Sequence, residues 1–362
     1  MQFMEMRKKV RATEDKKGKK YIVAALCAGL LAGMTGCGNA ETRINAATEL
    51  IRNLDYQGAL EELDAAEAEG ENMRLVERSR GIAYMGLTEY GEAVQAFLNS
   101  LEGSNGFLEE IDFDLNYYLA AAYTKNEQYA EAESTYDAIL ALRPDEKDAY
   151  FLRGNVRMSL GNYQGAKEDF DRVVLMEPRN YDRLISIYEV LAHFGYKEAG
   201  QEYLQTALAS GDKQMDNYVI GRIYYYLGEY QKACIALEEA REKGGVRSYL
   251  YLGRSYEATG DYNYAASVYN SYLAKYDGNA ELYNQLGLCE MAKGEYKKAL
   301  DAFQAGMKLG ESSMMQSLSF NEIVAYEYLE EYEQAFVLMG NYLKNYPDDA
   351  QAQREYAFLS TR

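Results

Sequence analysis

Apolar side chains recur along most of the chain in two alternating helical stripes. The segment at 249–260, YLYLGRSYEATG, carries apolar or small residues at positions i, i+3, i+4 and i+7, a spacing that places them on one face of an α-helix. The following segment at 260–272, GDYNYAASVYNSY, has a second stripe in which tyrosine, alanine and tyrosine are three and four residues apart. A glycine separates the stripes, so the pattern predicts a helix, a tight turn and a second helix.

The second stripe recurs nine times with nearly constant spacing. Each copy has a tyrosine, an alanine three residues later and a bulky apolar residue four residues after that. A first stripe precedes most copies and carries a small residue, usually glycine, where the two helices are expected to cross. Successive alanines are 32 to 39 residues apart, which predicts repeated helix pairs that bury their apolar faces against their neighbours. The nine alanines are Ala59, Ala93, Ala132, Ala166, Ala199, Ala233, Ala265, Ala299 and Ala335.

This pattern resembles the tetratricopeptide repeat, a helix-turn-helix unit of about 34 residues. The resemblance covers residues 43–347 and implies an all-α fold, a right-handed α-solenoid of about nine units. Residues 348–362 are expected to form a C-terminal capping helix. The chain's only prolines take the closing position of the family's pattern, at Pro144, Pro178 and Pro347.

Some positions depart from that pattern. Ile187 and Ile323 stand where other units have a small residue, so we expect looser or shifted helix packing in the fifth and ninth units. Additional residues around 103–111 lengthen one connection between units.

The N-terminal residues differ from the rest. Residues 1–20 carry eight Lys and Arg against three acids, and an uncharged apolar run follows, an order typical of a signal peptide. The sequence Met-Thr-Gly-Cys then resembles the bacterial lipobox. That resemblance implies removal of residues 1–36, lipidation of Cys37 and a short tether over 37–42. An ordinary cleaved signal with an incidental cysteine is the alternative.

The net charge argues against one class of partner, and the positions of the cysteines argue against a disulfide. Without its first 36 residues the chain keeps 30 basic and 54 acidic residues, a net charge of −24. Because such a surface repels phosphate backbones, we expect no nucleic-acid partner. Cys234 and Cys289 lie two units apart, too far for a disulfide, and are expected to be separate, reduced and core-facing.

No catalytic motif is present. The chain has a single histidine, which excludes a zinc site of the HExxH type. Cys-x-x-Cys pairs, an EF-hand loop and a Gly-x-Gly-x-x-Gly loop are absent, and the mature chain holds no Gly-Lys pair of a phosphate-binding loop. We therefore expect neither an enzyme nor a cofactor or metal site.

The resemblance implies that ligands bind the concave face formed by the first helix of each unit. Carried onto this chain, that face holds tyrosines and arginines in neighbouring units, and tyrosine beside arginine suits recognition of planar or carboxylate groups. The expected partner-binding residues are Tyr188, Tyr218, Arg222, Tyr225, Arg247 and Arg254. The opposing interpretation is that these tyrosines only pack helix on helix and that the arginines pair with local glutamates.

Two functions remain. In the first, the chain is an adaptor on the extracytoplasmic side of a bacterial membrane, held by its N-terminal lipid, which binds a protein or peptide partner of the cell envelope. In the second, it binds carbohydrate or wall polymer by stacking sugars on tyrosine. Sugar-binding platforms more often use tryptophan, which this chain lacks, and this favours the adaptor.

Overall fold

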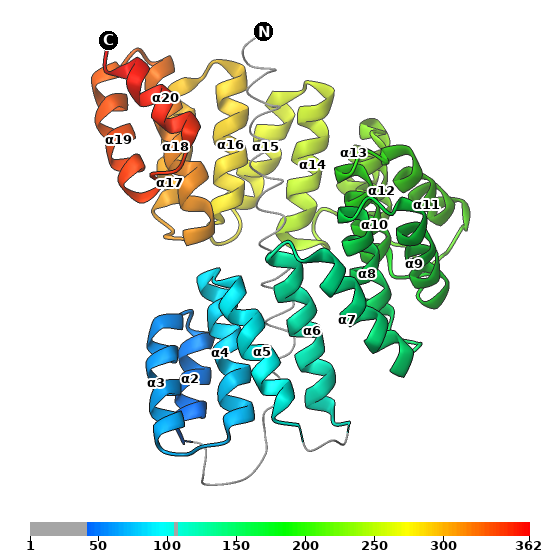
Figure 1. Ribbon diagram of the computed structural model, residues 1–362. Helices are drawn as coiled ribbons and strands as arrows, with labels where there is room; N and C mark the ends of the chain where they lie inside the picture. The colour runs from blue at the N-terminus through cyan, green and yellow to red at the C-terminus, as the bar shows by residue number, and fades with distance from the viewer. Residues whose placement is uncertain (1–41, 105–107) are drawn as a thin grey trace. The chain divides into compact units, whose positions relative to one another are not determined.

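The computed structural model describes residues 42–104 and 108–362 of the 362-residue chain. The predicted signal peptide, Cys37 and nearly all of the tether lie outside the described residues, as does part of the long connection predicted around 103–111. In the described part, all regular structure is α-helical (Figure 1). None of these helices combines the length and the apolar character needed to cross a bilayer.

The helices form two compact units that divide between Asn180 and Tyr181. The first contains α2 (Thr42–Arg52), α3 (Tyr56–Ala68), α4 (Met73–Leu87), α5 (Tyr90–Glu102), α6 (Glu110–Lys125), α7 (Tyr129–Leu142), α8 (Lys147–Ser159) and α9 (Tyr163–Met176). The second contains α10 (Tyr181–His193), α11 (Lys197–Ala209), α12 (Asn217–Leu227), α13 (Tyr230–Ala240), α14 (Gly245–Thr259), α15 (Tyr262–Leu273), α16 (Ala280–Lys293), α17 (Tyr296–Met307), α18 (Ser312–Tyr328), α19 (Tyr332–Asn345) and α20 (Ala350–Leu359).

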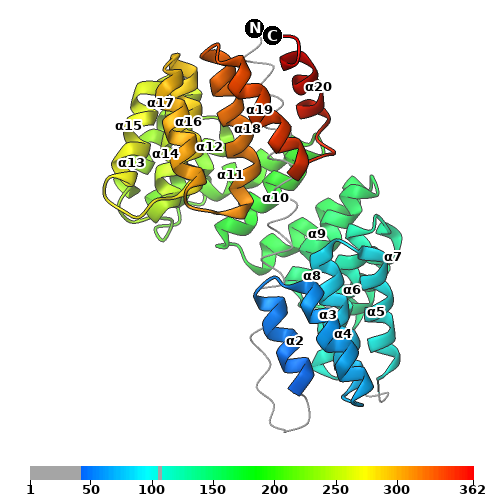
Figure 2. The same cartoon turned by 90° about the vertical axis from the view of Figure 1, so that its left-hand side faces the viewer.

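Consecutive helices pack in pairs, and within each compact unit every pair packs on the next. The first compact unit holds four pairs and the second holds five, followed by α20, which packs against α19 (Figure 2). The prediction of an all-α stack of about nine helix pairs with one terminal helix is confirmed.

The turns inside the pairs follow from their sequence. In three pairs the residue before the starting tyrosine, Asp55, Asn162 or Asp261, accepts a hydrogen bond from a backbone N–H of the second helix. This N-cap satisfies one of the four N–H groups that a helix start leaves unpaired. Several first helices end in a left-handed residue, as at Gly260 with φ of +85°, a conformation that glycine adopts without strain.

The helices of a pair cross where the sequence places its small residues. A side-chain Cβ added to Gly253 would overlap the ring of Tyr269, and one added to Gly287 would overlap the ring of Phe303. Both rings are fully buried. The predicted crossing point is therefore confirmed, with the glycine of the first helix seated on the bulky residue of the second helix.

The fifth pair corrects the predicted register by one residue. The other eight second helices begin at the tyrosine of the repeat, but α11 begins at Lys197, and Tyr196 is its exposed N-cap. Gly200, not the predicted Ala199, is the buried small residue, and its added Cβ would lie 3.1 Å from the Tyr188 Cα. Ile187 is fully buried. A glycine on the second helix thus accompanies the bulky isoleucine of the first.

The two remaining cysteines are buried, free and separate, as predicted. Burial is the main cause that raises the pKa of the Cys234 thiol to about 11. The Cys289 thiol, also raised mainly by burial, donates to Glu257 at 3.2 Å. Because the thiolate is the reactive form, both groups are poor nucleophiles.

Candidate functional site

The first helices of the second compact unit form a continuous layer. Helix α10 touches α12, α12 touches α14, and α14 touches α16, in addition to the contacts inside each pair. We call the surface made by these four helices the first-helix face. All six predicted partner-binding residues belong to three of these helices, α10, α12 and α14.

Arg222 of α12 lies between aromatic rings from two helices. Its guanidinium carbon is 5.2 Å from the ring centre of Tyr218 and 5.5 Å from that of Tyr251, within the range of cation–π attraction. Its Nη1 donates to the Asp182 carboxylate of α10. The guanidinium is thereby fixed by α10, α12 and α14 together.

Tyr218 and Tyr251 belong to a larger group of rings in mutual contact, and we call Tyr188, Tyr218, Tyr225, Tyr226 and Tyr251 the tyrosine cluster. The ring centres of Tyr188 and Tyr226 are 5.3 Å apart, as are those of Tyr225 and Tyr251. The Tyr226 hydroxyl lies 2.6 Å from Glu189, to which it donates, and 2.9 Å from the Tyr251 hydroxyl. Rings at these separations attract each other through edge and offset contacts, so the cluster is preorganised. Tyr188 is buried and the other four tyrosines are half-buried.

Burial controls the ionisation of the cluster. It raises the pKa of Tyr226 far above its ordinary value, and the nearby Tyr251 and Glu189 add to the rise. It also raises the pKa of Glu189, against the lowering effects of Tyr226 and Arg222. Burial, the largest single influence, lowers the pKa of Arg222, but the hydrogen bond to Asp182 together with the nearby Tyr251, Tyr218 and Asp182 outweighs it and leaves that pKa raised. The site therefore keeps the positive charge of Arg222 near Tyr218 and Tyr226, whose pKa values are raised.

The other two predicted arginines lie on α14 and differ from each other. Arg254 Nη2 donates to Glu281 of α16 at 2.8 Å. Arg247, near the start of α14, is exposed, and within the described residues it forms no ion pair. Its charge lowers the pKa of Tyr218, which burial raises.

The structure thus brings four of the predicted residues together, Tyr188, Tyr218, Arg222 and Tyr225. Arg222 and Arg254 each pair with a carboxylate of a neighbouring helix pair, as the packing interpretation expected. Sequence reasoning missed Tyr226, Tyr251, Asp182 and Glu189, because these residues fall outside the inward positions that the repeat pattern assigns. The run of three tyrosines at 224–226 is the one signal that indicates part of the cluster.

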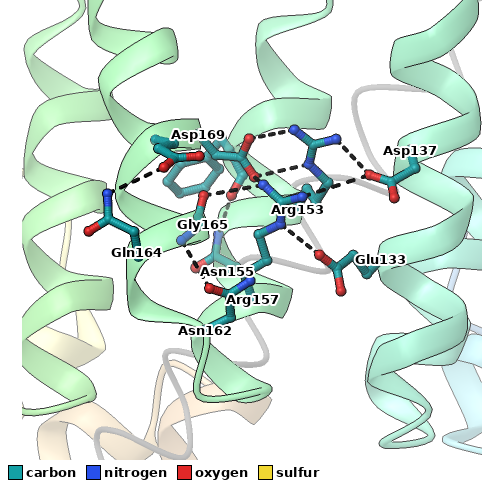
Figure 3. A network of polar contacts seen from close by, with 11 residues as sticks. Glu133, Asp137, Arg153, Asn155, Arg157, Asn162, Gln164, Gly165 and Asp169 are labelled. Atoms are coloured by element: carbon teal, nitrogen blue, oxygen red, sulfur yellow. Dashed lines mark hydrogen bonds and ion pairs between the residues drawn. The ribbon is translucent and has the colours of Figure 1, made fainter.

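A second polar network lies in the first compact unit, between α7, α8 and α9 (Figure 3). The buried Asp169 of α9 accepts from Arg153 Nε at 3.0 Å, from Arg153 Nη2 at 2.6 Å and from Arg157 Nη1 at 2.9 Å. The same arginines reach Asp137 at 2.6 Å and Glu133 at 2.7 Å on α7. Every acid and base in this network is paired, so its role is to hold three helices together.

No group of three or more metal-ligating side chains occurs in the part of the chain that the structure describes. The first-helix face offers stacking surfaces and guanidinium donors instead. These groups recognise peptide bonds, planar side chains and carboxylates by contact.

Comparison with known proteins identifies the repeat. Family models described as tetratricopeptide repeat match residues 119–186, 218–280 and 252–311. RNA polymerase II-associated protein 3 of Xenopus laevis is 24% identical over 208 residues, which are 58% of this chain and 28% of that protein. The human protein of the same name is 25% identical over 178 residues, 44% of this chain and 26% of that protein. The chain therefore spans less than a third of the length of these relatives.

Among solved structures, a tetratricopeptide repeat protein from Parabacteroides merdae is 16% identical, with a TM-score of 0.45 over 77% of this chain and 96% of that one. The family models place tetratricopeptide repeats at residues 119–186 and within 218–311, and repeats of this kind typically form protein-interaction scaffolds.

Proposed function

We propose that this chain is a lipid-anchored scaffold of the bacterial cell envelope that binds a protein or peptide partner on the first-helix face of its second compact unit. The observation that carries the proposal is the tyrosine cluster around Arg222, continued by Arg254 on the next first helix. Aromatic residues and arginine dominate the energetic centres of protein interfaces. The role we propose is binding, without catalysis.

The anchor part of the proposal rests on the sequence. The basic and apolar leader followed by Met-Thr-Gly-Cys at 34–37 supports diacylglyceryl transfer to the Cys37 thiol. A lipid at that residue would hold the first repeats near the membrane on its extracytoplasmic side, because the tether to α2 is short. A single anchored chain would then present its repeats to other envelope proteins.

Replacing Cys37 with alanine is expected to abolish lipidation, because alanine has no thiol to acylate. The measurement is incorporation of a clickable fatty-acid analogue into the full chain in its native cells, followed by separation of membrane and soluble fractions. Wild type should carry label and sediment with membranes, and the variant should do neither. The matched control is Cys27→Ala, which changes a cysteine inside the leader and should label as wild type does.

Equal labelling of wild type and the Cys37→Ala variant contradicts the lipid anchor. That result does not bear on partner binding by the first-helix face, which is tested separately by partner recovery and cross-linking. The carbohydrate-binding alternative predicts retention on a wall-polymer column that competing soluble polymer reverses.

A further inference from the structure

In each of the two ion pairs on the first-helix face, the carboxylate is more exposed than the arginine. The Arg222 side chain is 9% exposed, whereas its partner Asp182 is 77% exposed. The Arg254 side chain is 27% exposed and its partner Glu281 is 40% exposed. In both pairs the arginine is held by the fold and the carboxylate lies at the surface.

We propose that Asp182 and Glu281 occupy the positions that carboxylates of an acidic partner take in the complex. The partner displaces both side chains when it binds Arg222 and Arg254. This inference rests on the proposed function of the same face and adds to it both the chemistry of the partner and a built-in competitor. Binding is then an exchange in which one carboxylate leaves each guanidinium as another arrives.

The groups next to Arg222 favour the replacement of Asp182 by a carboxylate of the partner. An arginine keeps its charge in proteins and has five N–H donors. Its buried Nε and the buried Tyr218 hydroxyl have no hydrogen-bond partner within the described residues. The hydrogen bond to Asp182 therefore leaves at least one N–H donor of Arg222 without an acceptor. When displaced, its exposed carboxylate returns to water at little desolvation cost, while Tyr218 and Tyr251 keep the guanidinium in place.

The spacing of the two arginines specifies the partner further. Arg222 and Arg254 each follow the crossing glycine of their helix, Gly221 and Gly253, so they occupy equivalent places on adjacent first helices. Packed helices lie about 8–10 Å apart. A polyproline-II chain returns to the same side every third residue, after about 9 Å. An extended peptide with an acid at every third residue thus matches both guanidinium groups.

Without its first 36 residues the chain carries a net charge of −24, which repels an acidic peptide at long range, but less than it repels the densely charged phosphate backbone of a nucleic acid. At physiological ionic strength charges are screened over about 8 Å, so distant acids repel an approaching carboxylate weakly. The contacts with Arg222 and Arg254 are made inside that distance. The tyrosine cluster adds apolar contact with the prolines of such a chain.

The test compares peptide affinity in full-length variants. The probe is a fluorescent peptide of repeated Pro-Pro-Glu triplets, with the Pro-Pro-Gln peptide as its uncharged counterpart. Asp182→Asn should bind the acidic probe up to about five times more tightly than wild type, because the partner no longer has to displace an ion pair of about 1 kcal/mol. Arg222→Gln should lose most of the binding. The Gln probe should bind all variants weakly and equally.

Two further variants separate competition from side effects. Glu229→Gln removes one acid from an exposed ion pair with Lys232 just before α13, so it changes the net charge as Asp182→Asn does but should leave the affinity unchanged. Asp182→Glu keeps the competing charge and should bind as wild type does. A thermal midpoint within the wild-type range establishes that each variant is folded.

Each outcome decides the inference. A gain in Asp182→Asn that is absent in Glu229→Gln supports it. Binding through Arg222 without a gain in Asp182→Asn overturns the proposed displacement of Asp182 and leaves the proposed partner face intact. Absence of acidic-probe binding in both wild type and Asp182→Asn overturns the inference, while the proposed function is still decided by cross-linking to envelope proteins.

Discussion

Replacement of Asp169 by alanine is expected to destabilise the first compact unit by about 3 kcal/mol, because it leaves two largely buried arginines without their common acceptor. Asp169 is 2% exposed and takes three hydrogen bonds from Arg153 and Arg157. Breaking a buried pair costs about 3–5 kcal/mol. We expect the lower end of that range, because both arginines retain acids on α7.

The measurement is hydrogen exchange along the full chain. Because repeats contact mainly their neighbours, protection should fall in α7, α8 and α9 and remain unchanged in α16 and α17. The matched control is Asp171→Ala, which removes an acid from the same helix. Asp171 is half-exposed and pairs with Lys167, so this change should cost less than about 0.5 kcal/mol.

A second substitution is expected to restore the hydrogen-exchange protection that Asp169→Ala loses. Arg157 occupies the place that tyrosine holds in other units, such as Tyr256, and Asp169 occupies the place of the small apolar residues Ala236 and Ala302. The double variant Arg157→Tyr with Asp169→Ala restores the common pair and should recover at least half of the lost protection. If Asp169→Ala alone leaves exchange in α8 and α9 at the wild-type rate, the network does not stabilise the stack.

Neutralising both paired arginines of the first-helix face, Arg222→Gln with Arg254→Gln, is expected to reduce partner binding at least 30-fold. Loss of one member of a buried charged contact typically costs about 2–5 kcal/mol in an interface. Glutamine is preferred to glutamate because a new carboxylate at position 222 would face Asp182 and strain the fold. The measurement is recovery of partner proteins from envelope extracts by the immobilised mature chain.

The matched control is Lys232→Gln with Lys298→Gln, which removes the same charge from second helices. Both lysines are exposed and form an ion pair with a glutamate three residues away, and Lys232 also lies over the ring of Tyr224. Neither lysine belongs to the first-helix face, so recovery should equal that of wild type. Equal recovery by the arginine variant and by wild type, with both folded, shows that Arg222 and Arg254 serve packing rather than binding.

The repeat could be predicted because many residues of the same type recur at the same offsets. Nine tyrosines, nine small residues and nine bulky residues at fixed offsets locate the helices and their crossings, and glycines such as Gly253 contact the expected rings. The one-residue error in the fifth unit arose because Ala199 and Gly200 are both small and adjacent. Only the packing against Tyr188 shows which of the two faces the first helix.

The site was less predictable, because its contacts join different repeats. Inward positions indicated Tyr218 and Arg222, but the pairing of Arg222 with Asp182 depends on the rotation of α12 against α10, which no single repeat encodes. The Asp169 network did leave a signal. Arg157 and Asp169 depart from the pattern in the same unit, and paired departures of opposite charge indicate a contact.

The central claim is that partners bind the first-helix face of the second compact unit. Site-specific photo-cross-linking in native cells tests it most directly, with the photoreactive residue placed at Arg247 on α14 or at Ile235 on α13. Both residues are exposed, but only Arg247 lies on the first-helix face. A discrete protein adduct is expected from position 247 and none from position 235. An adduct from position 235 with none from position 247 would contradict the central claim.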